Sequence, residues 1–339
     1  MSKVDPIESV RAQMSVPLSF INAKLRGRRR RIYEGDRLES LKGCRNVKEL
    51  WQQLYPRRRG TGRVALERLL RQDAIAELCS FTHLLPEDTE TLYRTILRRF
   101  QVDNILVLLR LFAGSNQDIE STQYVPELPE DLAVPSGELL SCSNLEQFID
   151  LLPPDLGDEA RRSLELDKSQ ETTAFTEMAI ERAWWLKVCA ALEALSRRDR
   201  SNCGAPLLSE LSSSRLMAVL RAGRAYDLGW EEVKPYLPPV GPERAEGIGE
   251  PLSDGAMEEL FEDPTAENIT RRVPWVDEKT AGSLVQMERQ LWDRTFRLAN
   301  RVYYGVMEGP SIVVCYFYVK RNELENLIET VEDIHYSSR

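Results

Sequence analysis

The chain has 339 residues, 42% of them hydrophobic and 29% charged, a balance typical of a globular protein and not of a disordered or membrane-embedded one. The longest apolar run, residues 312–319, is far shorter than the roughly 20 residues of a membrane helix. We expect no secretory signal at the N-terminus. Six cysteines without CxxC spacing indicate reduced thiols. These features predict a cytosolic protein.

Charge is distributed unevenly along the chain. Residues 1–110 carry 22 Lys/Arg and 13 Asp/Glu, a net charge of +9, whereas the whole chain has −9, so residues 111–339 carry −18. Such asymmetry indicates an oriented electrostatic interaction. The uneven charges could attract a partner, or they could attract the first third of the chain to the rest of it. Composition alone does not distinguish these two explanations.

Most of the chain has the apolar spacing of amphipathic helices, for example over residues 66–78 and 180–192. Proline, glycine and serine cluster at three places, where we predict breaks. Two of these are acidic and contain several prolines, which marks them as candidate unit boundaries. The three predicted breaks span residues 124–136, 200–206 and 237–251.

A short helical pattern followed by a polar turn and a second helix start occurs three times. In the first two copies, Asn46 and Asn144 stand where an N-cap side chain would accept from the free amides of the next turn. In the third, Asp263 is predicted to cap a helix that opens with Pro264. The copies span residues 38–50, 137–148 and 257–269.

Two further elements recur in the same order. One is a hydrophobic-Glu-Arg step that opens a longer helix, at intervals of 114 and 107 residues; the other is a closing helix, offset by 111 residues both times. Helical proteins often show loose self-similarity, but an ordered period near 110 favours an internal repeat. The steps start at Leu66, Ile180 and Met287, and the closing helices span residues 104–110, 215–221 and 326–332.

We therefore predict an all-α fold of three similar helical units, at residues 1–125, 126–235 and 236–339. One segment conflicts with this prediction, because residues 312–319 are β-branched and aromatic and would alone indicate a buried strand. Their position directly before a closing helix favours a helix instead.

The chain offers no convincing catalytic, cofactor or metal constellation. Cys79 and His83 have a spacing that could present two zinc ligands, but no third or fourth ligand is near them in sequence. No glycine-rich phosphate loop is present. Glu181 and Glu288 could be considered a carboxylate pair, but each precedes an arginine at a repeated position, which indicates surface or inter-helix ion pairs. The protein is therefore not expected to be an enzyme.

A basic segment near the N-terminus is the strongest candidate for partner contact. Six cations within eight residues could bind an acidic partner, nucleic acid or lipid headgroups. Consecutive residues of a helix point in different directions, so some of these side chains must face the protein itself. The candidate contact residues are Lys24, Arg26, Arg28, Arg29, Arg30 and Arg31.

Three segments together resemble a known family. Residues 22–32 are similar to a signature in which small and basic residues precede a basic helix, and residues 38–54 to a leucine- and glutamate-rich helix-turn-helix. Residues 309–328 resemble a closing motif, where Tyr316, Asn326 and Leu327 carry the match. In these motifs the chain resembles, over residues 18–333, the C subunit of the A/V-type rotary ATPases, the counterpart of the eukaryotic d subunit.

The resemblance implies a funnel of three helical units around a pseudo-threefold axis, without catalytic residues, cofactors or metals. It further implies a central-stalk role at the cytoplasmic side of the membrane, with one copy per complex. There the protein would join stalk subunits to the proteolipid c ring and transmit torque during ATP-linked H⁺ or Na⁺ transport, without binding nucleic acid. The alternative is a helical-repeat scaffold or regulatory protein that binds an acidic partner or nucleic acid through its basic helix.

Overall fold

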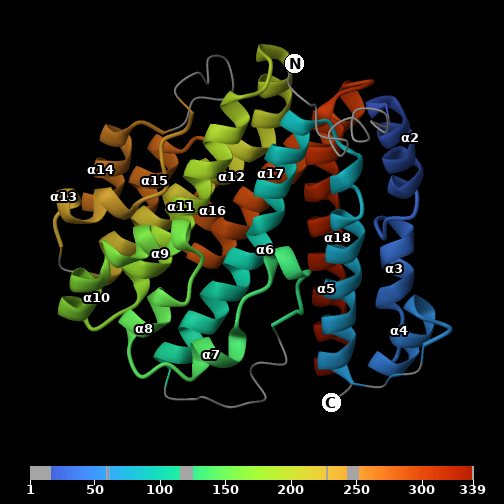
Figure 1. The fold of residues 1–339 in the computed structure, drawn as a ribbon, viewed down its shortest axis with the longest axis horizontal. Helices are drawn as coiled ribbons and strands as arrows, with labels where there is room; N and C mark the ends of the chain where they lie inside the picture. Colours follow the sequence, from blue (N-terminus) through green and yellow to red (C-terminus); the bar gives the residue numbers. More distant parts are fainter. Residues whose placement is uncertain are drawn as a thin grey trace, which may run out of the picture. The chain divides into compact units, whose positions relative to one another are not determined.

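The computed structural model describes residues 17–58, 60, 62–114, 125–226, 228–242 and 252–337, and within these ranges the fold is all-α, without a strand, as predicted (Figure 1). None of the described helices is long and apolar enough to cross a membrane. The chain divides into two compact units, which we call unit 1 (residues 1–97 and 301–339) and unit 2 (residues 98–300).

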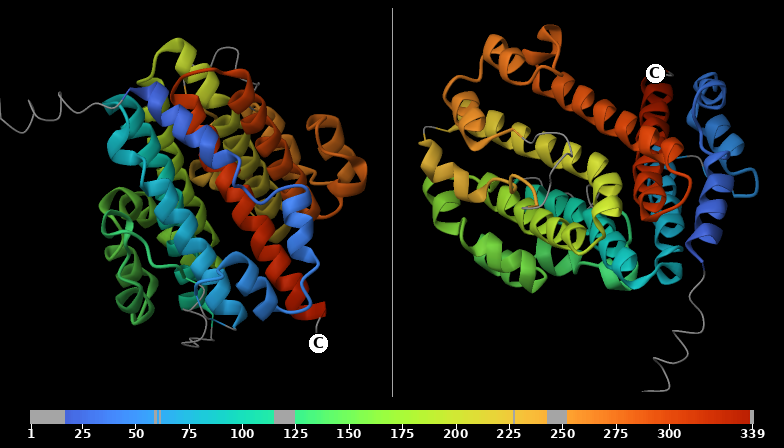
Figure 2. Two further views of the ribbon diagram at one scale, coloured as in Figure 1. Left: turned by 90° about the vertical axis from the view of Figure 1, so that its right-hand side faces the viewer. Right: turned by 90° about the horizontal axis from the view of Figure 1, so that it is seen from above.

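Unit 1 is built around the C-terminal helix α18 (Pro310–Ser337), which packs against α5 (Arg63–Cys79) and against the first three described helices (Figure 2). Its core joins the apolar faces of these helices, with Leu50, Leu66 and Val331 fully buried. The N- and C-terminal parts of the sequence thus share one core. The first three described helices are α2 (Leu18–Arg29), α3 (Asp36–Lys42) and α4 (Val47–Leu54).

The ambiguous segment 312–319 lies inside α18, so the prediction of a helix is confirmed. All eight of its side chains are buried. A helix that is covered on every side is apolar on every side, which explains why the segment lacks helical periodicity. Gly309, at φ 148°, precedes Pro310 at the first helical position, where a proline has no hydrogen bond to lose.

Unit 2 centres on the long helices α11 (Ala174–Glu193) and α12 (Arg197–Ala225). The helix α9 (Pro154–Arg161) packs on α11, and α14 (Asp254–Glu262) on α12. The contact with α14 requires a glycine, because a Cβ at Gly223 would clash with the Phe261 carbonyl.

Shorter helices complete unit 2. They are α7 (Ser136–Leu140), α8 (Leu145–Asp150), α10 (Leu164–Gln170), α13 (Trp230–Val233), α15 (Ala266–Arg272) and α16 (Glu278–Ala281). Short 3₁₀ turns occur at Thr82–Leu84 in unit 1, and at Glu130–Leu132 and Lys234–Tyr236 in unit 2. The boundary between the units falls within α6 (Glu87–Ala113) and α17 (Leu284–Gly305).

Two of the three predicted helix caps are correct. The Asn46 side chain accepts from Glu49 N at 3.0 Å, and that of Asn144 accepts from Gln147 N at 2.9 Å. The third prediction is wrong, because Asp263 ends α14, with its amide bound to the Glu259 carbonyl. Thr265 caps α15 instead.

The predicted break at residues 200–206 is also wrong, because these residues lie inside α12. The helix begins earlier, where the Ser196 side chain accepts from Asp199 N at 3.2 Å. Pro206 costs α12 one backbone hydrogen bond, but its ring and the neighbouring Leu207 are buried. Tertiary packing therefore outweighs the helix-breaking tendency of the proline.

Each predicted repeat contains a helix-turn-helix followed by two long helices. The Glu-Arg steps all lie in the first long helix, and two of them make inter-helix ion pairs as interpreted: Glu181 with Arg99 at 3.1 Å, and Glu288 with Arg221 at 2.9 Å. Units 1 and 2 are defined by their compactness and not by a repeated structure. The boundaries of the three predicted repeats and the pseudo-threefold funnel therefore stay predictions. The long pairs are α5 and α6, α11 and α12, and α17 and α18.

The closing helices of the first two repeats each hold the linker that follows them. Asn104 Nδ2 donates to the Pro126 carbonyl at 2.9 Å, and Arg215 Nη1 donates to the Pro238 carbonyl. Arg215 is buried and also reaches Asp254 Oδ1 at 2.5 Å, so it fastens both the linker and the start of α14 to α12. Equivalent positions, 111 residues apart, thus perform the same task with different side chains.

We expect Arg215→Met to lower the free energy of unfolding by about 1–3 kcal/mol, because it removes two hydrogen bonds from a buried site. The matched control is Arg221→Met on the same helix, whose ion pair with Glu288 is more than half exposed and is worth under about 1 kcal/mol. Urea unfolding of both variants measures the difference. Equal losses would show that Arg215 contributes no more than a surface charge.

Candidate functional site

The six basic residues proposed for partner contact, on α2 and the turn that ends it, divide into outward- and inward-facing groups. Lys24, Arg30 and Arg31 are exposed, Arg26 and Arg28 are half-buried, and Arg29 is buried. Because successive residues of a helix are turned by about 100°, neighbouring arginines cannot share one face. The expectation that some of them face the protein itself is therefore correct.

The inward-facing arginines attach α2 to the rest of unit 1. Arg26 Nη2 donates to the Val306 carbonyl at 2.7 Å and to the Met307 carbonyl at 3.1 Å, in the turn between α17 and α18. Arg29 forms a two-pronged pair with Glu34, at 2.5 and 2.7 Å. These two side chains have structural partners already.

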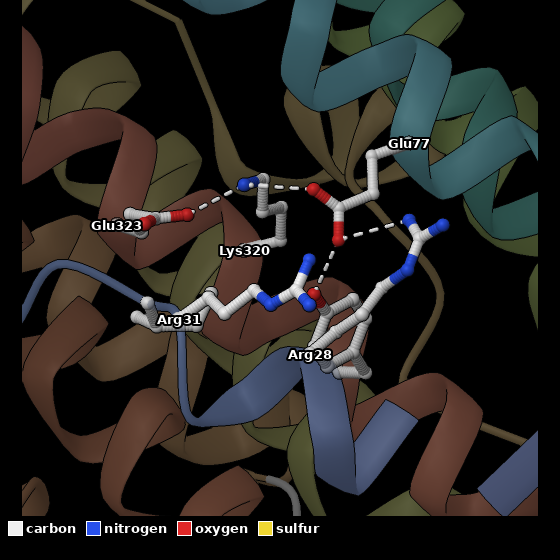
Figure 3. A pocket seen from close by; sticks show the side chains of 7 residues that line it. Arg28, Arg31, Glu77, Lys320 and Glu323 are labelled. Atoms are coloured by element: carbon white, nitrogen blue, oxygen red, sulfur yellow. Dashed lines mark hydrogen bonds and ion pairs between the residues drawn. The ribbon is translucent and has the colours of Figure 1, made fainter. Parts of the chain in front are cut away.

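Arg28 belongs to a charged pocket of about 190 Å³ between α2, α5 and α18 (Figure 3). Its centre is Glu77, whose carboxylate accepts from Tyr316 Oη at 2.6 Å and pairs with Lys320 Nζ at 3.0 Å and Arg28 Nη1 at 3.2 Å. Three helices thus converge on one carboxylate. The lining residues are Arg28, Arg31, Ile32, Glu77, Tyr316, Lys320 and Glu323.

A second carboxylate continues the network. Glu323 accepts from Lys320 Nζ at 2.6 Å through one oxygen and from the backbone amide of Tyr33 at 2.7 Å through the other. It therefore anchors the segment that follows α2 to α18. Lys320 lies between Glu323 and Glu77 and is shared by both.

The pKa values in the pocket follow from this arrangement. Burial alone would raise the pKa of Glu77, but Lys320, Tyr316 and Arg28 outweigh it, and the pKa is lowered. Burial would lower the pKa of Lys320, but Glu323 and Glu77 outweigh it and raise that pKa. Burial and the hydrogen bond to Glu77 raise the pKa of Tyr316. The Glu77–Lys320 pair is therefore charged near neutral pH.

Arg31 differs from the other pocket cations. No hydrogen bond or ion pair joins its side chain to another of the described residues, and it is exposed. Figure 3 shows it reaching across the pocket toward Arg28, with no interaction drawn to it. The pocket can therefore still bind an acceptor.

The side chains of the pocket form ion pairs with one another, and the residues considered as zinc ligands lie elsewhere. Cys79 ends α5 and His83 lies in the following 3₁₀ turn. Within the described ranges, no group of three or more His, Cys, Asp or Glu side chains could hold a metal ion. The expected lack of catalytic, cofactor and metal sites is not tested by that observation and stays a prediction.

Sequence reasoning found Arg28 and Arg31 but missed Lys320 and the two carboxylates of the pocket. Glu77 was one of several charged residues on α5, and only its contact with Tyr316, 239 positions away, distinguishes it. Lys320 and Glu323 follow the apolar half of α18 in the sequence. This change from apolar to charged residues could have marked them as candidate site residues.

Comparison with known proteins supports the resemblance. The family model described as ATP synthase (C/AC39) subunit matches residues 21–338. The match runs from α2 to the last residues of the chain, so it includes every residue that lines the pocket. The search of curated proteins found no match.

We expect Glu77→Gln to destabilise the protein by about 1–3 kcal/mol at neutral pH, because an amide cannot balance Lys320 and Arg28. The pKa of Glu77 is lowered from its usual 4.5, so its contribution is complete above that pH and is lost as pH falls through the folded-state pKa. The difference from the unsubstituted protein should therefore shrink below pH 4.5.

Chemical unfolding from neutral to acid pH measures this convergence. The matched control is Glu39→Gln, which removes an exposed pair with Lys42 and should cost little at any pH. A loss for Glu77→Gln that does not change with pH would show that the ionised carboxylate is not what stabilises the pocket.

Proposed function

The chain belongs to the ATP synthase C/AC39 subunit family, whose members are structural and not catalytic, and we propose that it couples the central stalk of a rotary ATPase to the membrane ring. As a rotary ATPase subunit it has partners within that complex. The proposed partners are the stalk subunits on one side and the proteolipid c ring on the other, with one copy per complex. The protein would be peripheral, on the cytoplasmic side of the membrane.

The family match over residues 21–338 is the observation that carries this proposal. Transmission of torque requires a body that resists shear, and close-packed helices provide it. In unit 1, α18 is buried along residues 312–319 and packs against α5 and α2–α4, so a force on one helix spreads over several contacts. Contact with the partners would rely on complementary charge, which favours the exposed cations at α2.

Affinity capture of the native full-length chain tests the proposal. Recovery together with stalk and ring subunits would support it. Recovery alone, or with nucleic acid as the main partner, would reject it in favour of the helical scaffold considered above. Nuclease treatment and a high-salt wash separate the two outcomes, because binding to phosphates weakens steeply with salt.

The basic residues at α2 should divide into two functional groups. Joint replacement of the exposed Lys24, Arg30 and Arg31 by alanine should weaken assembly and leave stability within about 0.5 kcal/mol, because surface substitutions rarely cost more. Arg29→Ala should instead destabilise by about 1 kcal/mol, the Glu34 carboxylate being half exposed. Capture yield and thermal unfolding, measured on both, check this division. If the triple variant assembled normally, these exposed cations would not be the contact.

A further inference from the structure

The charged pocket holds one cation more than its own carboxylates balance. Arg28, Arg31 and Lys320 face two carboxylates, Glu77 and Glu323. We propose that this pocket receives a single carboxylate side chain from a partner polypeptide, which binds Arg31. The inference rests on the proposed function for the existence of the partner and names the contact that the end of α2 makes with it.

Arg31 is the group that an incoming acceptor would meet. Glu77 already binds three donors, and Lys320 is shared between two carboxylates, so these groups are satisfied within unit 1. The Arg31 guanidinium, by contrast, makes no polar contact with the described residues. A guanidinium offers two parallel N–H groups that match the two oxygens of a carboxylate.

The charge balance favours a carboxylate over a phosphate dianion. One negative charge brings the pocket to neutrality. A phosphate dianion would leave an excess negative charge next to Glu77 and Glu323, which repels it in a partly buried site. Because the pKa of Glu77 is lowered, this carboxylate would not take up a proton to relieve that repulsion.

The surroundings of the pocket suit a polypeptide. Ile32 forms an apolar wall against which the methylene groups of a glutamate can pack. One and two turns before Arg31, the outward face of α2 carries the small residues Gly27 and Ala23, both exposed. A Cβ added at Gly27 would meet nothing within 4 Å, so a partner backbone can come close beside the pocket.

The pocket is also held in shape before any partner arrives. Arg28 is fixed by Glu77, and Glu323 fixes the segment after α2 through the Tyr33 amide at 2.7 Å. A preformed site loses little conformational entropy on binding. Arg31 is thus presented on a rigid support.

The test compares two charge reversals on the full-length chain, Arg31→Glu and Arg45→Glu. Both residues are exposed, but Arg45 neither lines the pocket nor belongs to the proposed contact. We expect Arg31→Glu to lower the recovery of rotor subunits at least roughly tenfold relative to Arg45→Glu, with Arg31→Lys intermediate, since an ammonium lacks the two-pronged geometry. Unfolding temperatures of both variants separate a loss of contact from a loss of folding.

A cross-link identifies the partner group. A photoreactive amino acid at position 31 should attach to a peptide of a rotor subunit that contains Asp or Glu. Changing that acidic residue to arginine should restore assembly of the Arg31→Glu chain. Inorganic phosphate, compared with acetate at equal ionic strength, should not displace the partner preferentially.

The outcomes separate this inference from the proposed function. If the unsubstituted chain recovers no rotor subunits, the proposed function fails. If it recovers them but Arg31→Glu and Arg45→Glu behave alike, only the carboxylate contact fails. A cross-link to lipid alone, absence of rescue by the charge swap, or specific displacement by phosphate would likewise overturn it.

Discussion

A half-buried carboxylate joins the first and last parts of unit 1. Glu77 on α5 is the common acceptor for Arg28 on α2 and for Tyr316 and Lys320 on α18. Its removal would leave two cations partly desolvated, a far larger penalty than the loss of a surface pair. Because the charges come from opposite ends of the sequence, the N-terminal basic helix can be stable in this position only when α18 is folded beside it.

This network answers part of the question that the uneven charge distribution raised. Pairing within the protein accounts for three residues of the basic segment, and contact with a partner stays a proposal for the exposed ones. Arg26, Arg28 and Arg29 are used internally, by carbonyl groups and by acidic side chains of unit 1. Successive residues of a helix point in different directions, so the same basic segment also presents Lys24, Arg30 and Arg31 to solvent.

The sequence predicted interactions between neighbouring residues better than interactions between residues far apart in the chain. The caps at Asn46 and Asn144 were predictable because an N-cap acts within one turn. Pro206 misled the prediction because its local preference is overridden by burial. Asp263 misled it because an aspartate can end one helix as well as begin the next. Arg28 and Arg31 could be found because they lie in a dense basic run, but Glu77 and Lys320 could not, since they meet on helices that are remote in sequence.

The linker contacts bear on the predicted internal repeat, which is weak at the level of residues. Asn104 and Arg215 both donate to the carbonyl of a proline in the linker that follows, Pro126 and Pro238. The carbonyl of a proline accepts a hydrogen bond from any donor. An amide side chain and a guanidinium can therefore both hold the linker. Such a contact constrains where a donor stands and leaves its identity free. An internal repeat held by contacts of this kind would keep its period while its motifs diverge.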